Sequence, residues 1–330
     1  MVTGDASLAH PTELPAEFAL IDRHFRPLAG GGALGLSDDA AVLMPPPGRE
    51  LVIAADAMVA GVHFLPDDLP DLIARKLLRT NLSDLAAMAA TPLGYLLTVS
   101  VPRDTSDAWF AAFAAGLAQD QAEFGIHLLG GDTTSTSGPV SLSLTILGTV
   151  APGCALRRVG AWAGDEVWVT GTIGDGALGL LAARGELADP TGHLAGRYHL
   201  PQPRVAFGQR LHRIAGAGMD VSDGLVQDLD HLCRAAGLAA VIDAAVVPLS
   251  DAARDAGPQW LERCLTGGDD YELLLAVPPA NAAALQEAAR ATGIAVTRLG
   301  DFRPGEARAT VRAHDGASMR LSRGGWSHFW

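Results

Sequence analysis

Short apolar runs alternate with longer segments of helical periodicity along this chain, and the alternation restarts after Ala151-Pro152-Gly153. Leu51–Asp56 has the length and apolar content of a buried strand, whereas residues 71–90 carry apolar side chains at helical spacing. Strands and helices in alternation pack as α/β or α+β layers around a shared core. We therefore expect a two-domain α/β (α+β) fold, with one domain over residues 1–152 and the other over residues 153–330.

The other expected elements follow from the same periodicities and from the Gly and Pro residues that interrupt them. A strand over Ile126–Leu129 should end at Gly130-Gly131-Asp132, and the second half repeats this Gly-Gly-Asp ending at Gly267-Gly268-Asp269. A turn is expected at Ala217-Gly218, after a helix over residues 204–215. Further strands are expected at Tyr95–Val101, Val140–Val150, Glu166–Thr170, Ala239–Asp243, Glu272–Val277 and 295–301, and further helices at 107–124, Ala177–Arg184, 225–236 and 279–292.

The surplus of acidic residues excludes one class of partner and restricts another. The chain of 330 residues carries 37 acidic and 24 basic residues, which gives a formal net charge of −13. A general nucleic-acid binder needs a basic face, and this composition does not provide one. The same acidity repels anionic substrates unless metal cations lie between them and the protein.

The sequence predicts a cytoplasmic protein without a membrane partner. No apolar run reaches the ~18 residues of a membrane span, and the polar N-terminal stretch has no apolar segment of the signal-peptide type. The three cysteines, Cys154, Cys233 and Cys264, lie far apart, so they form neither a disulfide framework nor a zinc-ribbon motif.

Two glycine motifs match dinucleotide-binding loops by letter but lack the structural context. Gly30-x-Gly32-x-x-Gly35 has no clear strand before it and no helix after it. Gly174–Gly179 follows a strand and opens a helix, yet no second strand ending in an acid follows soon after, so a tight strand-to-helix turn is the better interpretation. GxxxxGK[ST], HExxH and GxSxG motifs are absent.

Aspartates recur among small and apolar residues, where strands are expected to end or turn. Carboxylates in such settings should be partly buried, and a buried charge needs a partner. Too few basic residues lie near them in sequence to pair them all. For any one aspartate a turn or helix cap is the simpler interpretation, but the set as a whole favours Mg²⁺ held by oxygen ligands. Its members are Asp38, Asp39, Asp56, Asp84, Asp132, Asp220, Asp223, Asp269 and Asp270.

Several Mg²⁺ ions in one site indicate phosphate substrates. ATP brings a charge of roughly −4 and a phosphate monoester roughly −2, so about three or four Mg²⁺ would offset much of the charge of the substrates and carboxylates. Because there is no Walker lysine, the ions would have to hold the phosphates. Metal ions would also explain how an acidic protein binds anionic substrates.

The order of the motifs resembles one enzyme family. SDDAAV, AADAMVAGVHF, NLSDLAAMAATP, GGDTT, TGTIGDGALGL, MDVSDGL and GGDDYEL occur here in the order found in thiamine-monophosphate kinases, which belong to the aminoimidazole-ribonucleotide synthetase superfamily. The likeness extends from about residue 18 to the tail, and the ordered set is specific although each motif alone is weak. It implies ATP-dependent phosphorylation of thiamine monophosphate to thiamine diphosphate, the final step of that biosynthesis. It also implies a homodimer whose N-terminal domains pair.

The resemblance also implies a role for each matching residue. In the family pattern, the first domain binds metal and ATP and the second completes the cleft. Catalysis would rest on Asp132, Asp220 and Asp223. The Mg²⁺ ligands would be Asp39, Asp56, Asp84, Asp132, Asp220 and Asp223; the ATP contacts would be Gly131, Asp132, Arg158 and Ser222; and the thiamine phosphate contacts would be His63, Asp269 and Trp326.

The chain departs from the family pattern at three places. Ser37 stands where a glycine usually precedes the first aspartate pair, and Ala54-Ala55 replace the Ser-Thr pair that helps to bind metal. Asp269 replaces a glutamate and is shorter by one methylene. The alanines predict a weaker Mg²⁺ site, and Asp269 predicts a shift in substrate geometry with the charge retained.

Several alternatives remain at this point. The chain is a kinase, a sister enzyme of the superfamily such as selenophosphate synthetase, or a binding paralog without turnover. The first glycine loop has no reactive cysteine, which argues against selenophosphate synthetase. His63 is alternatively an interior histidine, Trp326 a packing residue, and Lys76 a solvated or dimer-facing lysine. Either Arg157 or Arg158 points inward.

Overall fold

The computed structural model describes residues 16–313 and 315–327, so the predicted polar N-terminal stretch lies mostly outside the described residues. The first half of the chain builds a four-stranded sheet in the order β1-β4-β2-β3. β4 pairs antiparallel with both of its neighbours, and β2 and β3 run parallel. The strands are β1 (Glu50–Val59), β2 (Thr91–Pro102), β3 (Leu128–Thr136) and β4 (Ser141–Val150).

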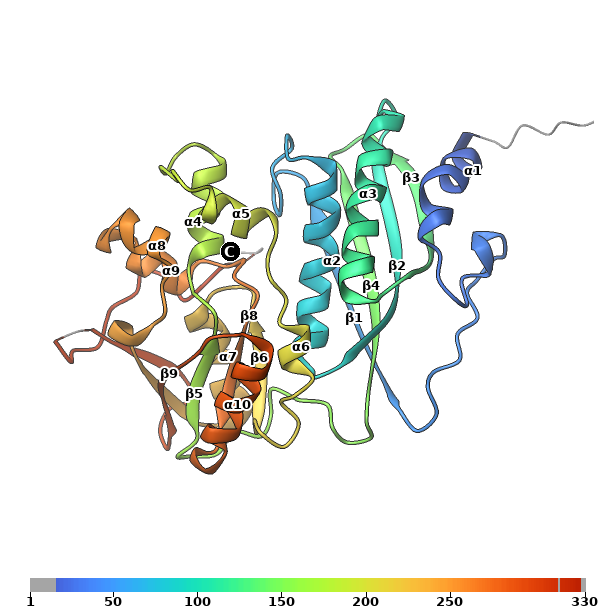
Figure 1. Ribbon diagram of the computed structural model, residues 1–330. Helices are drawn as coiled ribbons and strands as arrows, with labels where there is room; N and C mark the ends of the chain where they lie inside the picture. The colour runs from blue at the N-terminus through green and yellow to red at the C-terminus, as the bar shows by residue number, and fades with distance from the viewer. Residues whose placement is uncertain (1–15, 314, 328–330) are drawn as a thin grey trace, which may run out of the picture.

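Two long helices, α2 (Pro70–Ala87) and α3 (Asp107–Phe124), cover one face of this sheet (Figure 1). α3 begins where the Ser106 hydroxyl accepts a hydrogen bond from the Trp109 N–H, and it ends at Gly125 in the left-handed conformation. Within residues 16–313 and 315–327, the other face is largely uncovered: Leu51, Ile53 and Leu96 are between 41% and 60% exposed. Before the sheet come α1 (Ala16–Leu20), η1 (Ile21–Phe25), η2 (Arg26–Leu28) and η3 (Leu34–Leu36).

The second half builds a six-stranded sheet in the order β10-β7-β9-β5-β8-β6. Its pairs are antiparallel except for the parallel β10–β7 pair. The strands are β5 (Glu166–Thr170), β6 (Ala217–Val221), β7 (Ala239–Asp243), β8 (Glu272–Val277), β9 (Val296–Arg303) and β10 (Ala309–Arg312).

Helices surround the second sheet on both faces. α7 packs on one face, where Val167, Leu274 and Ile242 belong to the same buried cluster as Leu229. The helices are α4 (Asp175–Ala183), α5 (His193–His199), α6 (Val205–Gly208), α7 (Leu225–Ala236), α8 (Asp251–Ala256), α9 (Leu261–Thr266) and α10 (Ala282–Thr292), with short 3₁₀ turns η4 (Ala244–Val246), η5 (Pro258–Trp260) and η6 (Pro279–Asn281).

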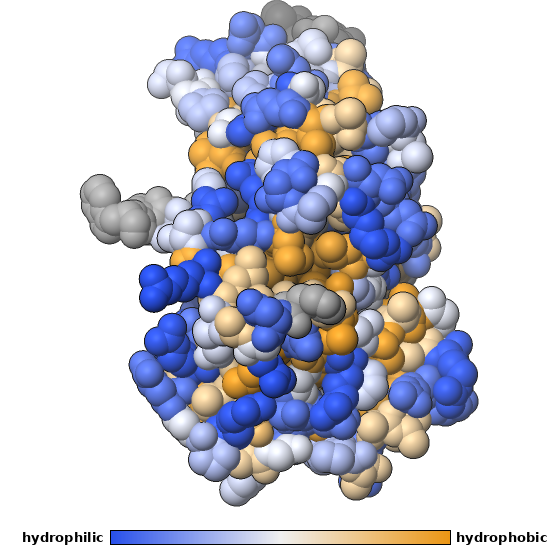
Figure 2. Space-filling model, turned by 90° about the vertical axis from the view of Figure 1, so that its left-hand side faces the viewer, coloured by the Kyte–Doolittle hydropathy of each residue, from blue (hydrophilic) through white to orange (hydrophobic). Residues whose placement is uncertain are grey.

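The two halves share one hydrophobic core. Leu77 and Leu97 from the first half lie in the same buried cluster as Phe207, Leu273 and Leu275 from the second. α2 lies between the two sheets (Figure 1), and this position buries it on nearly all sides. The edge strand β6 contacts α2 directly. On the outer face of the second half, apolar residues gather in a central hollow ringed by polar ones (Figure 2).

The two-domain α/β prediction is confirmed, but several local predictions are wrong. β3 does not end at Gly130-Gly131-Asp132; it continues through these residues to Thr136 because β2 pairs with it along this whole stretch. The second Gly-Gly-Asp follows α9 and precedes β8. The expected turn at Ala217-Gly218 is the start of β6. The helix expected over 204–215 is only α6. No helix of the described residues is long and apolar enough to cross a membrane.

Candidate active site

The NLSD motif lies on the buried part of α2 and connects the two halves of the molecule. The Asn81 side-chain oxygen accepts a hydrogen bond from the Asp56 N–H of β1 at 3.2 Å. Slightly further along the helix, the Ser83 hydroxyl donates to Asp220 Oδ2 of β6 at 2.8 Å. α2 therefore fixes an aspartate from each half beside its own Asp84.

These carboxylates repel one another. The pKa of Asp84 is raised to about 8, first because protein surrounds the carboxyl group and then because Asp220 and Asp56 carry negative charge nearby. Burial and Asp56 likewise raise the pKa of Asp220 to about 6, and burial and Asp223 raise the pKa of Asp56. Arg158 acts in the opposite direction on both Asp84 and Asp220. The structure thus brings four of the six predicted metal ligands together, with Arg158 rather than Arg157 beside them.

Asp228 organises the loop that carries Ser222 and Asp223, and it was not among the residues predicted from the sequence. Its Oδ2 accepts hydrogen bonds from the Ser222 and Asp223 N–H groups, both at 3.0 Å. Burial, followed by the charge of Asp220, raises the pKa of Asp228 to about 8. An acidic residue in the first turn of α7 was the available signal, because carboxylates there commonly hold the preceding backbone N–H groups.

The Gly-Gly-Asp-Asp loop packs directly on this Ser222 loop. The Asp269 N–H donates to the Ser222 carbonyl at 2.9 Å, and the Tyr271 N–H donates to the Val221 carbonyl at 2.8 Å. A Cβ on Gly268 would lie 2.3 Å from the Ser222 carbonyl oxygen, so only glycine permits this approach. The MDVSDGL and GGDDYEL motifs of the second half therefore form one continuous surface.

The three predicted substrate residues lie around this surface. His63 Nδ1 accepts a hydrogen bond from the Val59 N–H at 3.0 Å, and the His63 carbonyl oxygen and Asp269 both bind the Lys76 ammonium group. The Trp326 N–H donates to the Asp223 carbonyl at 2.9 Å, which places the C-terminal segment beside the carboxylates. Lys76 is only 2% exposed, so its interpretation as a solvated lysine is wrong.

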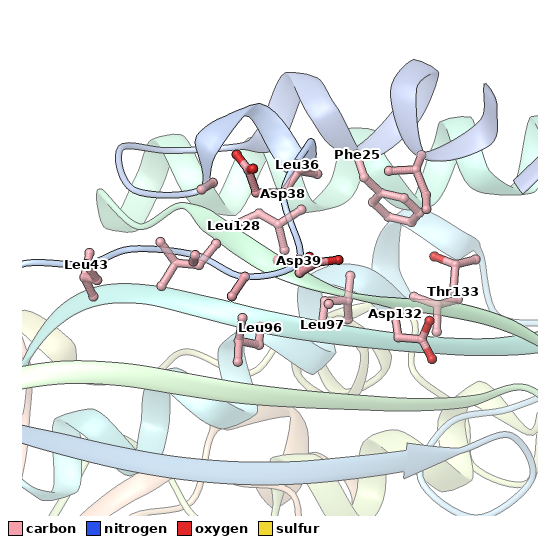
Figure 3. Close-up of a pocket in the computed structure, with 18 of the residues that line it drawn as sticks. Phe25, Leu36, Asp38, Asp39, Leu43, Leu96, Leu97, Leu128, Asp132 and Thr133 are labelled. Atoms are coloured by element: carbon pink, nitrogen blue, oxygen red, sulfur yellow. The ribbon is translucent and has the colours of Figure 1, made fainter. Parts of the chain in front are cut away.

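Asp39, Gly131 and Asp132 lie at a second place, around a cavity of about 560 Å³. In Figure 3, Asp39 belongs to the loop that passes over the sheet, whereas Asp132 belongs to β3 beneath it. The rest of the lining is mostly apolar, including Phe25 and Leu128. A polar edge on an apolar cavity suits a ligand with both a ring and a charged group.

The sheet separates this cavity from the cluster formed by Asp56, Asp84, Asp220 and Asp223. Asp132 is in register with Thr98, Thr98 with Ser143, and Ser143 with Ala57, the neighbour of Asp56. Three strand spacings amount to about 14 Å. Within the described part of one chain, Asp39 and Asp132 therefore do not join the group around Asp56.

The first group suits Mg²⁺ by its chemistry. Asp56, Asp84, Asp220 and Asp223 offer only oxygen ligands, and burial together with neighbouring negative charge raises the pKa of Asp56, Asp84 and Asp220. Among the described residues, no three His, Cys, Asp or Glu side chains are arranged closely enough to hold a metal ion by themselves. Mg²⁺ usually keeps several waters and shares its ligands with substrate phosphates, so such an open arrangement fits it.

Comparison with known proteins places this chain in a family. Residues 37–150 match the N-terminal domain of AIR synthase related proteins, and residues 163–311 match the C-terminal domain. The thiamine-monophosphate kinase of Caulobacter vibrioides is 47% identical over 332 residues, covering 98% of this chain and 94% of that protein. The chain belongs to the thiamine-monophosphate kinase family.

Solved structures agree with this assignment. The thiamine-monophosphate kinase from Stenotrophomonas maltophilia superimposes with a TM-score of 0.82 at 40% identity, covering 92% of this chain and 98% of that one. AaThiL, complexed with AMPPCP and TMP, superimposes with a TM-score of 0.76 at 26% identity, covering 94% and 96%. The family, the enzyme class and the two-domain fold predicted from the sequence are thereby confirmed.

Proposed function

We propose that the protein transfers the γ-phosphate of ATP to thiamine monophosphate in a Mg²⁺-dependent reaction. The observation that carries the proposal is the cluster of Asp56, Asp84, Asp220 and Asp223, whose charge requires cations. The kinase relatives, one of them complexed with AMPPCP and TMP, support the choice of substrates. Residues 1–152 would bind metal and ATP and form the dimer, and residues 153–330 would complete the cleft.

The reaction requires no general base from the protein. A phosphate monoester is largely ionised near pH 7, so its oxygen can attack the γ-phosphorus as the bond to the β–γ bridging oxygen breaks. Bound Mg²⁺ would neutralise phosphate charge and align the two phosphates. Arg158 can contact a phosphate with its planar guanidinium group, and Gly131 and Ser222 directly precede Asp132 and Asp223, two of the aspartates assigned to Mg²⁺. Catalysis then consists of positioning and charge neutralisation for in-line transfer.

Thiamine binding would use the surface between Asp269, His63 and Trp326. Trp326 is 44% exposed, and its indole ring can stack on the cationic thiazolium ring. Its backbone hydrogen bond to the Asp223 carbonyl would keep the substrate phosphate close to the carboxylates. A cytoplasmic location stays a prediction.

A homodimer would bring the two separated groups of aspartates together. Asp39 and Asp132 lie at the β3 edge of the sheet, and Asp56 lies on β1 at the opposite edge. The open apolar face with Leu51, Ile53 and Leu96 is a suitable contact for a second copy. In a symmetric pair, Asp39 and Asp132 at the β3 edge of one subunit would then lie beside the aspartate cluster around Asp56 of its partner.

A product assay tests the proposal. The purified protein is incubated with ATP, MgCl₂ and thiamine monophosphate, and thiamine diphosphate is resolved by chromatography, with EDTA and thiamine-only controls. We expect diphosphate from the monophosphate alone and none in EDTA. If both ligands bind by calorimetry without turnover, the protein is a binding paralog in which Ala54-Ala55 have weakened the metal site. If neither ligand binds, the substrate assignment is wrong.

A further inference from the structure

Lys76 is the only lysine of the chain, and it is buried between the two domains beside the proposed substrate surface. It lies on α2, and its side chain is 3% exposed. A buried ammonium group is costly unless charged or polar groups surround it. The groups around Lys76 therefore indicate its role.

Three groups of the protein surround the Lys76 ammonium group. Nζ donates to Asp269 Oδ2 at 3.0 Å and to the His63 carbonyl oxygen at 3.1 Å. Its third side faces the Tyr198 ring of α5, whose centroid is 3.6 Å away. An ammonium group with three occupied directions and almost no exposure is not available to bind a substrate phosphate.

The residues that Lys76 holds are those proposed to contact thiamine monophosphate. Asp269 and Tyr271 both have positive φ values, 73° and 52°, which are unfavourable for residues other than glycine. Such a loop keeps its shape only while contacts hold it. Tyr271 donates a hydrogen bond to Asp269 Oδ1 at 3.3 Å, and Lys76 binds Oδ2 from the other domain.

We propose that Lys76 is a positioning residue, which holds Asp269 and the His63 segment in the geometry that binds thiamine monophosphate. This inference rests on the proposed function, because it concerns the same substrate surface. It also changes the part assigned to Asp269: the carboxylate is already paired with an ammonium group, so it orients the substrate more than it attracts the thiazolium charge.

Steady-state kinetics of Lys76→Met tests the proposal. Methionine keeps the length and apolar stem of the side chain but cannot hold Asp269. We expect the KM for thiamine monophosphate to rise about tenfold or more, as when other orienting contacts are removed. The KM for ATP should stay within about twofold, and Lys76→Arg should restore part of the loss. In the Asp269→Asn background, Lys76→Met should add little, because both changes remove the same contact.

Arg75→Met is the matched control, because Arg75 is the adjacent cation on α2 and is paired with Asp120, away from the substrate surface. Its melting temperature is expected to change, but its KM for thiamine monophosphate is not. If the wild-type enzyme turns over thiamine monophosphate and Lys76→Met has an unchanged or lower KM, the positioning role is wrong while the kinase function stands. If the wild-type enzyme shows no turnover, the proposed function itself fails.

A chemical measurement keeps the test decisive even if Lys76→Met does not fold. An amine-acylating reagent can modify only Lys76 and the α-amine of the chain, and peptide mass spectrometry separates the two products. We expect slow acylation of Lys76 in the native protein and clearly faster acylation in Asp269→Asn, where the ammonium group loses its charged partner. Fast acylation of the native protein, or equal rates in the two proteins, would overturn the proposal.

Discussion

Hydrogen bonds hold the backbone of Asp223 at both its N–H and its carbonyl group. The Asp223 N–H donates to Asp228, and the Asp223 carbonyl oxygen accepts from the Trp326 N–H. Because both adjoining peptide groups are held, the position from which the side chain extends is fixed. Its charge acts on Asp56 of the other domain. A small change to this side chain should therefore alter the chemistry without disturbing the fold.

We predict that Asp223→Asn lowers kcat by about 10²–10³-fold if the carboxylate holds a catalytic Mg²⁺. Steady-state assays at saturating ATP and thiamine monophosphate measure the effect. Asp251→Asn makes the same chemical change at a side chain that is 93% exposed, and it should leave kcat unchanged. Turnover of Asp223→Asn near the wild-type value would remove Asp223 from the catalytic groups.

At the scale of single residues, the sequence singled out the aspartates that the structure brings together, but not the contacts that hold them. Asp56, Asp84, Asp220 and Asp223 stood out by their small and apolar neighbours, and the structure brings them together. The roles of Lys76 and Asp228 depend on partners that are distant in sequence or on the geometry of a loop. Lys76 reaches a residue 193 positions away, and no local pattern contains that contact.

In strand β3, backbone geometry restricts which residue can occupy a single position. At Gly131, φ is 156°, and a Cβ would lie 1.7 Å from the Leu97 carbonyl oxygen of β2. At the adjacent Gly130, the atom nearest to an added Cβ would be Leu96 Cδ2, at an ordinary contact distance of 3.5 Å. The two neighbouring glycines therefore differ sharply in what they tolerate.

Gly131→Ala should separate β3 from β2 and displace Asp132. We expect at least about a tenfold loss of affinity for a non-hydrolysable ATP analogue, since a displacement of about 1 Å is enough to disrupt such a site. Calorimetry measures the affinity, and Gly130→Ala serves as the control with little expected change. Equal affinities in the two variants would show that this strand does not form the nucleotide site.

The element boundaries show where sequence patterns are insufficient. The helices over residues 71–90 and 107–124 were predicted well, because their apolar periodicity continues over several turns. β3 was predicted too short, since Gly-Gly-Asp normally signals a turn and only its pairing with β2 keeps these residues extended. β6 was missed because all five of its residues are buried, so it shows no alternation.

For the whole molecule, mixing of subunits tests whether each site needs two chains. Asp132→Asn and Asp220→Asn should each be inactive. Suppose that each site combines Asp132 of one subunit with the aspartate cluster around Asp220 of the other. A mixed dimer then has one intact site and one site that carries both substitutions. Random exchange then restores about a quarter of the wild-type activity. If each site lies within one chain, the mixture stays inactive, and the proposal of a site shared between two subunits is wrong.

The crowded carboxylates also predict how stability depends on pH and Mg²⁺. Asp84 and Asp228 have pKa values of about 8 and Asp220 of about 6, against about 3.9 in an unfolded chain. Between these values the folded protein binds more protons than the unfolded chain, so its stability falls as pH rises. Mg²⁺ binds the charged carboxylates, so its stabilising effect should increase over the same range.

Thermal unfolding between pH 6 and pH 9, in EDTA and in MgCl₂, measures this dependence. We expect the melting temperature in EDTA to fall with pH by about 2–4 °C for each kcal/mol lost, and the difference between the two conditions to widen. Asp84→Asn should flatten the EDTA curve. A Mg²⁺ effect that is constant across this range would contradict metal binding at these carboxylates.

The core that runs from Leu77 and Leu97 into Phe207, Leu273 and Leu275 has a consequence for how substrates enter and leave. Rotating the two domains apart would expose these side chains to water, at about 25 cal/mol for each Å² uncovered. Opening of the molecule by rotation of one domain away from the other is therefore costly. We therefore expect the two domains to keep their relative position during catalysis, and substrate entry and product release to depend on surface segments such as the loop that carries Asp39 over the sheet.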